Sequence, residues 1–103
     1  MAFVMTADFK INPDSREIVD QAIRQFIREI LENEPGTLLY TSCRDADEPN
    51  RYLHFFVFEN ETAEQRHRAT DWVTRFTDVL YPETIDGVNF NRFDLVSSTS
   101  DFK

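Results

Sequence analysis

The sequence contains very little glycine and cysteine, and each shortage narrows what the protein can do. Only two of the 103 residues are glycines, Gly36 and Gly87. No glycine-rich loop can cradle a phosphate, so a nucleotide cofactor is not expected. The single cysteine, Cys43, excludes an intrachain disulfide framework and is typical of a reducing compartment. We therefore expect a cytoplasmic protein without disulfides.

Positive charge and long apolar runs are also scarce. The chain has 11 Lys and Arg against 19 Asp and Glu, which gives a net charge of -8 at pH 7. An acidic surface repels phosphate backbones and anionic headgroups, so neither nucleic acid nor a membrane is an expected partner. No run of about 18 apolar residues is present, so no segment is expected to span a bilayer. The N-terminal segment meets Asp8 without a basic region, unlike a signal peptide.

One pattern of strand, amphipathic helix and strand occurs twice. We predict the first copy at residues 3–11, 15–33 and 37–45, and the second at residues 52–59, 63–80 and 88–97. Two such units indicate an α+β, ferredoxin-like β-α-β-β-α-β fold. The antiparallel sheet is expected in the order 4-1-3-2, with both helices on one face. Residues 1–103 form one predicted domain, in which 98–103 are a frayed tail.

The two predicted helices differ in regularity. In the first, apolar residues recur at helical spacing over residues 18–31, which is typical of a helix that covers a core. Asp14 or Ser15 is expected to cap it. The second helix is more polar, and Thr62 with Gln65 is expected to form a capping box at its start.

A turn-rich loop at residues 46–50 joins two predicted strands into a hairpin. If Glu48 is its centre, Ser42 lies opposite His54, and opposed residues share a face of the sheet. One face then carries Tyr40, Ser42, Tyr52, His54, Phe56 and Phe58, and the other carries Leu53, Phe55 and Val57. Cys43 is expected opposite Leu53, away from His54.

The second of these faces needs a cover. The strand that contains it is apolar on both sides, whereas two helices on one face leave the other open. The economical cover is a second copy of the same sheet. We therefore expect a homodimer whose interface contains Leu53, Phe55 and Val57.

Four short segments, in order, resemble motifs of the antibiotic biosynthesis monooxygenase superfamily. Residues 34–40, EPGTLLY, resemble its EPG-x-x-x-Y junction, and residues 47–52, DEPNRY, resemble its D-x-P-x-R-F hairpin. Residues 58–63, FENETA, are similar to its W-x-D-x-x-A motif, and residues 87–93, GVNFNRF, are similar to its last strand. His67 falls where the family has a histidine. The resemblance covers residues 4–97.

The resemblance implies a ferredoxin-like subunit whose sheet pairs with a second copy into a dimeric α/β barrel. Some members oxidise quinols or polyketide-type aromatics with oxygen and without metal or flavin, and others degrade haem. The sequence departs from the family at three positions. Phe56 stands where relatives often carry glutamate, Phe58 where they often carry tryptophan, and Trp72 where many have a second histidine.

The helix-facing side of the hairpin is expected to line an aromatic pocket for a small aromatic molecule. His67 is the first candidate catalytic base and His54 the second, because histidine can accept a proton from a phenolic hydroxyl near neutral pH. The candidate substrate-binding residues are Tyr40, Phe56, Trp72 and Phe76, around the ring, and Asn60, on a carbonyl. A filled aromatic core, with His54 satisfied inside it and His67 at the rim, is the alternative.

A metal site has weak support. Glu64, His67 and Asp71 share one face of the predicted second helix, but a single Glu-x-x-His motif supplies too few ligands for a functional metal. We expect neither metal nor cofactor.

The sequence favours a cofactor-independent monooxygenase acting on a phenolic, quinol or polyketide-like aromatic. Two alternatives stay open: a non-catalytic binding or structural dimer of the same fold, and a polyketide cyclase or isomerase. A cavity above about 300 Å³ that touches His67 would favour an enzyme, whereas a closed core would favour the structural role.

Overall fold

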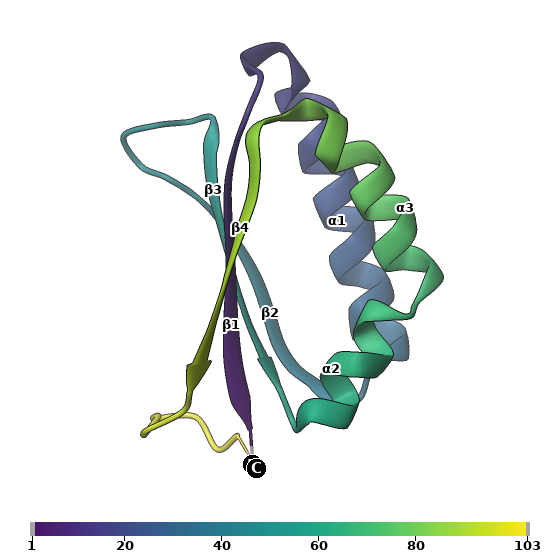
Figure 1. The fold of residues 1–103 in the computed structure, drawn as a ribbon, viewed down its shortest axis with the longest axis vertical. Coiled ribbons are helices and arrows are strands. Elements are labelled where there is room, and N and C mark those ends of the chain that lie inside the picture. Colours follow the sequence, from purple (N-terminus) through teal and green to yellow (C-terminus); the bar gives the residue numbers. More distant parts are fainter. Residues whose placement is uncertain (1, 103) are drawn as a thin grey trace.

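The computed structural model describes residues 2–102 and contains a four-stranded antiparallel sheet with all helices on one face (Figure 1). The strands are β1 (Phe3–Ile11), β2 (Thr37–Arg44), β3 (Arg51–Phe58) and β4 (Thr84–Asp94). The helices are α1 (Arg16–Asn33), α2 (Glu61–Arg68) and α3 (Asp71–Leu80), with 3-10 turns η1 (Pro13–Ser15) and η2 (Tyr81–Glu83). The strand order β2-β3-β1-β4 confirms the predicted ferredoxin-like fold.

The hairpin between β2 and β3 has the predicted register. Ser42 pairs with His54, and Cys43 pairs with Leu53. His54 is completely buried beneath the helices. Leu53 and Phe55 lie on the opposite face and are 43% and 38% exposed. The alternation of the strand and the turn chemistry were sufficient to place these side chains.

Helix α1 packs against the sheet through one continuous stripe, formed by Val19, Ile23, Phe26 and Ile30. Ser15 is the residue before this helix, but its hydroxyl makes no cap. It donates instead to a carboxylate oxygen of Glu83, at 2.5 Å. The predicted side-chain cap by Asp14 or Ser15 is therefore not formed.

The second predicted helix is two helices. α2 ends at Arg68 and α3 begins at Asp71, because the Thr70 hydroxyl accepts a hydrogen bond from the backbone N–H of Val73 and starts a new helix. The predicted capping box at Thr62 is wrong. Asn60 caps α2 instead, accepting from the backbone N–H of Ala63 at 2.9 Å.

The helix-free face is partly covered by the chain itself. Val57 is completely buried in a cluster with Ala2 and Val4, against which Leu95 and Phe102 pack. The C-terminal tail, yellow in Figure 1, thus returns to the end of the sheet where β1 begins. Val57 is not part of the open apolar surface predicted for it. The apolar side chains of the described strands that are still exposed on this face are Leu39, Leu53, Phe55, Ile85 and Phe93.

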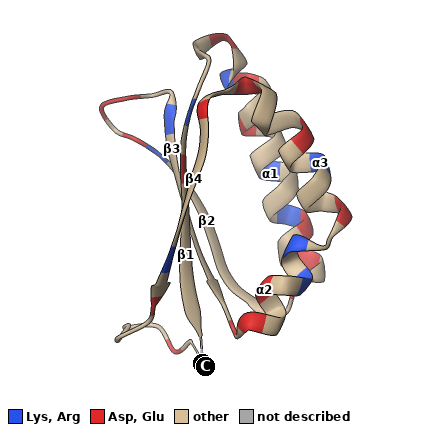
Figure 2. Cartoon of the chain, in the orientation of Figure 1, with Lys and Arg blue, Asp and Glu red and all other residues tan. Residues whose placement is uncertain are grey.

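Charged residues are frequent in the helices and in the loops, whereas the middle of the sheet carries few of them (Figure 2). No helix within residues 2–102 is long and apolar enough to cross a membrane. The apolar interior therefore lies between the sheet and the helices, which is where the candidate site is found.

Candidate active site

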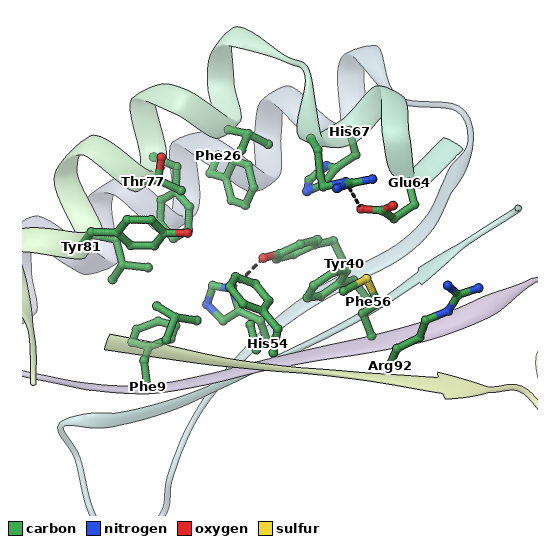
Figure 3. Close-up of a pocket in the computed structure, with 18 of the residues that line it drawn as sticks. Phe9, Phe26, Tyr40, His54, Phe56, Glu64, His67, Thr77, Tyr81 and Arg92 are labelled. Carbon is green, nitrogen blue, oxygen red and sulfur yellow. Dashed lines mark hydrogen bonds and ion pairs between the residues drawn. The ribbon is translucent and has the colours of Figure 1, made fainter. Parts of the chain in front are cut away.

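A pocket of about 520 Å³ lies between the sheet and helices α2 and α3 (Figure 3). Its wall is mainly aromatic and draws on every layer of the fold: Phe9, Phe26, Tyr40, Phe56, Phe76 and Phe90. His54 and His67 add polar groups to this wall. The cavity exceeds the size that the sequence analysis set for a ligand site, and it touches His67. This part of the interior is a pocket and not a filled aromatic core.

Five of the predicted site residues line this pocket: Tyr40, His54, Phe56, His67 and Phe76. Asn60 and Trp72 are not among the lining residues. The side-chain oxygen of Asn60 is engaged in capping α2. The indole N–H of Trp72 donates to a carboxylate oxygen of Glu34, so its one hydrogen-bond donor is engaged within the protein.

Glu34 is the residue of the site that the sequence analysis missed. One of its carboxylate oxygens is 2.8 Å from Nδ1 of His67 and accepts from the Thr37 hydroxyl at 2.7 Å. Burial acts to raise the pKa of Glu34, but the hydrogen bonds from His67, Trp72 and Thr37 outweigh it and hold the pKa below its ordinary value. Glu34 is therefore a carboxylate at neutral pH. Its place in the EPG segment was the only sequence signal.

The carboxylate of Glu34 fixes what His67 can do. A carboxylate only accepts hydrogen bonds, so the hydrogen of a neutral His67 ring sits on Nδ1 and the lone pair on Nε2. His67 is buried against the rings of Phe26 and Phe58, at centroid distances of 5.8 and 5.2 Å. The pair combines an oriented imidazole base with a carboxylate that stabilises its protonated form.

A close approach of backbones brings His67 to Glu34. Gly36 lies in the turn between α1 and β2, and a Cβ atom there would be 2.7 Å from Cβ of Ala63 in α2. Only a residue without a side chain lets α2 pack this tightly against the turn. The same turn carries Glu34, whose backbone N–H still bonds to Ile30 at the end of α1. The Glu34–His67 contact depends on this packing.

His54 is more completely buried than His67. Its Nδ1 is 2.7 Å from the hydroxyl of Tyr40, and its ring contacts Phe9 edge-on and stacks on Phe76. Burial lowers the pKa of His54 to about 4. Burial also raises the pKa of Tyr40, with smaller contributions from the charges of Glu34 and Tyr81. At neutral pH both groups are uncharged, and His54 is a weak base there. Its prediction as a second proton acceptor does not fit this environment.

The mouth of the pocket is lined by charged residues of β4 and α2. The guanidinium of Arg92 lies 4.3 Å from the ring centre of Phe3, and Arg68 pairs with Glu64 at 2.5 Å. Asp71 starts α3, so the break between the helices separates it from the face that Glu64 and His67 share. Within residues 2–102, no group of three or more His, Cys, Asp or Glu side chains is arranged to hold a metal ion.

Comparison with known proteins identifies the family. The family model described as antibiotic biosynthesis monooxygenase matches residues 2–79. The chain belongs to the antibiotic biosynthesis monooxygenase family. This confirms the resemblance seen in the sequence motifs. An uncharacterized protein from Synechocystis sp. is 31% identical over 75 residues, which are 73% of this chain and 50% of the relative. The chain thus spans about half the length of that relative.

Solved structures of family members share the fold. A candidate antibiotic biosynthesis monooxygenase from Caulobacter crescentus CB15 matches with a TM-score of 0.88 and 20% identity, over 93% of this chain and 91% of that one. Another, from Nitrosomonas europaea, matches with a TM-score of 0.89 and 16% identity, over 96% of this chain and 94% of that one. At these identities the likeness establishes the architecture alone.

Proposed function

We propose that this member of the antibiotic biosynthesis monooxygenase family is a cofactor-independent monooxygenase of phenolic, quinol or polyketide-like aromatics. The observation that carries the proposal is the Glu34–His67 pair, 2.8 Å apart, on the wall of an aromatic pocket of about 520 Å³. The descriptions of the Caulobacter and Nitrosomonas proteins as candidate antibiotic biosynthesis monooxygenases support the same class of reaction.

The shape of the pocket suits a planar ring. Phe26 and Phe76 stack with centroids 4.3 Å apart, and Tyr40 and Phe56 stack with centroids 4.8 Å apart. Flat aromatic walls of this kind bind a planar molecule by dispersion and offset stacking. The volume falls within the range of about 300–1,000 Å³ that is usual for small-molecule sites. We therefore expect an aromatic substrate of two or three fused rings.

The reaction begins when Nε2 of His67 takes a proton from an activated ring CH2 or hydroxyl, and Glu34 stabilises the imidazolium that forms. The substrate anion is electron-rich enough to reduce O2 directly. For a ring CH2 next to a conjugated carbonyl, the CH2 group and O2 become a C=O group and water. Carbon loses two C–H bonds and four electrons, one oxygen atom enters the product, and the other leaves as water.

Two features of the residues support a reaction without a cofactor. The chain has two glycines and neither lines the pocket, so no backbone loop there can approach a phosphate closely. The pocket is lined by aromatic rings and by two histidines, one from the sheet and one from a helix. Within residues 2–102, no three His, Cys, Asp or Glu side chains lie close enough together to hold a metal ion. The oxidant required is O2 itself.

A second candidate uses the same pair. A polyketide cyclase or isomerase also needs an oriented base, and the buried carboxylate of Glu34, 2.8 Å from His67, orients one. This reaction moves a proton within the substrate and consumes no oxygen. The two candidates therefore differ in one measurable requirement.

Oxygen uptake with a panel of anthrones and quinols tests the proposal. We expect one O2 consumed per anthrone converted, with the rate unchanged after treatment with a chelator. Substrate conversion that continues under nitrogen would indicate the cyclase or isomerase. Binding of the panel with no conversion in either atmosphere would indicate the non-catalytic role.

We also infer a homodimer formed through the helix-free face. Five apolar side chains of the described strands remain open there: Leu39, Leu53, Phe55, Ile85 and Phe93. Several exposed apolar side chains on one face are typical of an interface, and a second copy of the same face would cover them. Phe55→Lys would place an unpaired charge in that contact and should dissociate the dimer in sedimentation. Leu31→Lys, at an 84% exposed position of α1, is the control. A monomeric wild type at micromolar concentration would contradict the inference.

A further inference from the structure

One ring nitrogen of His54 has no partner in the folded chain. His54 is 0% exposed, and its Nε2 is the one buried side-chain nitrogen or oxygen within residues 2–102 that makes no hydrogen bond. Buried polar atoms are nearly always paired, because an unpaired one loses its bonds to water without replacement. An exception inside a pocket therefore points to a partner that comes from outside.

The contact between His54 and Tyr40 determines what Nε2 presents. The Tyr40 oxygen is 2.7 Å from Nδ1 of His54. If Tyr40 donates, the imidazole hydrogen sits on Nε2 and one donor is unpaired. If His54 donates instead, both the Tyr40 hydrogen and the Nε2 lone pair are unpaired in a buried site. The first arrangement leaves fewer unpaired groups, so Nε2 carries a hydrogen.

No group within residues 2–102 accepts this hydrogen. The ring contacts Phe9 and Phe76, with centroids 5.2 and 6.0 Å away. Its neighbours in the adjacent strands are Ala7 and Ser42, and neither bonds to Nε2. Phe9, Phe76 and Ala7 line the pocket together with His54. In Figure 3 the bond to Tyr40 leaves one side of the His54 ring, and the other ring nitrogen lies on the side away from Tyr40.

We propose that the Nε2–H group of His54 binds an oxygen of the ligand, a ring carbonyl or a phenolate, so that the pocket selects aromatic ketones and their enolates. His54 would be the donor of the site and His67 the acceptor, with the Tyr40 ring contacting both at centroid distances of 5.4 and 6.2 Å. Tyr40 is a positioning residue, because it holds the tautomer that can donate.

This role deepens the proposed function and in its catalytic part rests on it. When His67 removes a proton beside a carbonyl, negative charge gathers on the carbonyl oxygen. A donor already aimed at that oxygen stabilises the charge without having to reorient. His54 is suited to this because burial lowers its pKa to about 4, so it stays a neutral donor throughout the neutral range.

Binding of 1-tetralone and of tetralin tests the inference. The two molecules share one skeleton and differ in the carbonyl, and neither requires turnover. We expect calorimetry to show 1-tetralone binding about 5–100-fold more tightly than tetralin, the range of one buried hydrogen bond whose loss leaves a donor unpaired. His54→Phe should remove this preference by weakening the ketone, with tetralin affinity within about twofold of wild type. A preference retained in His54→Phe, or absent in wild type, would overturn the inference.

A nitrogen-15 NMR spectrum makes the test independent of whether His54→Phe folds. The chain has two histidines, so His67→Gln leaves the ring signals of His54 alone. We expect the Nε2-protonated tautomer in the free protein, and a shift of its Nε2–H on adding 1-tetralone but not tetralin. An Nδ1-protonated ring, or equal responses to both molecules, would refute the role.

The two proposals fail in different ways. A ketone preference with no oxygen uptake on the anthrone and quinol panel would overturn the monooxygenase function and leave the His54 subsite standing. Oxygen uptake with no ketone preference would do the reverse. Tyr40→Phe separates positioning from packing, since it keeps the ring and should change the His54 tautomer populations and reduce the ketone preference.

Discussion

The two strand–helix–strand halves of this chain follow one plan and differ in their helices. In the first half, α1 runs unbroken for 18 residues and fills the interior with one apolar stripe. In the second half, the helix is divided into α2, of 8 residues, and α3, of 10 residues. His67 comes from the shorter piece, and the pocket lies against both pieces. The continuous helix belongs to the first half, and the break between α2 and α3, beside which His67 lies, belongs to the second.

Two tyrosines on the same face of the sheet show how the filled part of the interior differs from the pocket. Tyr52 stacks on Phe9 at 5.2 Å, and its hydroxyl reaches past the core to Asp20 at 2.5 Å. The hydroxyl of Tyr40 ends inside the pocket, on His54. In the close-packed core the tyrosine hydroxyl forms its hydrogen bond near the surface, whereas in the pocket the hydroxyl forms it with another residue of the site. Polar groups can therefore line the pocket without being left unpaired inside the fold.

Removing the base of the second half should have the largest effect. His67→Ala should lower turnover of an anthrone substrate by about 10²–10⁴-fold, because proton removal loses its acceptor. Affinity should change little, since the aromatic walls remain. Glu34→Gln should lower turnover less, because the imidazole stays and loses only the carboxylate that orients it. Steady-state oxygen uptake measures both variants.

Glu29→Gln is the matched control for this prediction. Glu29 pairs with Arg75 and is not among the residues lining the pocket, so the same change of charge there should leave turnover near the wild-type rate. If His67→Ala turned over at the wild-type rate, the assignment of the base would be wrong.

The buried histidine of the pocket should make stability depend on pH. Burial lowers the pKa of His54 from 6.5 to about 4 in the folded protein. Between these values the unfolded chain binds more protons than the folded one, so the free energy of unfolding falls as pH falls through this window, by about 3 kcal/mol in full. Urea unfolding at pH 7 and pH 4.5 should show a drop about 2 kcal/mol smaller in His54→Phe than in wild type. Equal drops would contradict the burial argument.

Two valines, one in the close-packed core and one on the pocket wall, should show directly how tightly each region is packed. Val19 is completely buried in the core under α1, and Val73 is only partly buried and lines the pocket. Val19→Ala should lower the free energy of unfolding by about 2 kcal/mol, because it opens a cavity in close-packed surroundings. Val73→Ala should cost under about 1 kcal/mol, since it enlarges a space that already exists. Thermal or urea unfolding measures both, and equal losses would mean that the pocket side is packed as tightly as the core.

The elements set by local pattern could be predicted from the sequence. The register that pairs Ser42 with His54 follows from the turn and from strand alternation, and the stripe of α1 follows from helical spacing. The break at Thr70 could not be foreseen in this way. Apolar spacing continues across it, and a single threonine is a weak signal until its hydroxyl is seen to accept from Val73.

The site itself was predictable only in part. His54 and the aromatic rings of the hairpin face were placed correctly, because they share one register. The contact of Glu34 with His67 spans 33 positions and depends on how α2 packs against a turn, which no local pattern encodes. The same applies to Asn60 and Trp72, whose polar groups bond within the protein. Val57 is covered by a tail whose path the sequence does not specify.

The near contact of Gly36 with Ala63 has a consequence for redesign. This contact sets the distance between α2 and the turn that contains Glu34. A larger side chain at either position, such as Ala63→Val, would push that wall of the pocket outward, admitting bulkier rings while drawing the imidazole away from its carboxylate. The packing of Gly36 against Ala63 therefore affects both the range of substrates and the strength of the base. A variant selected for larger molecules should also become a slower catalyst.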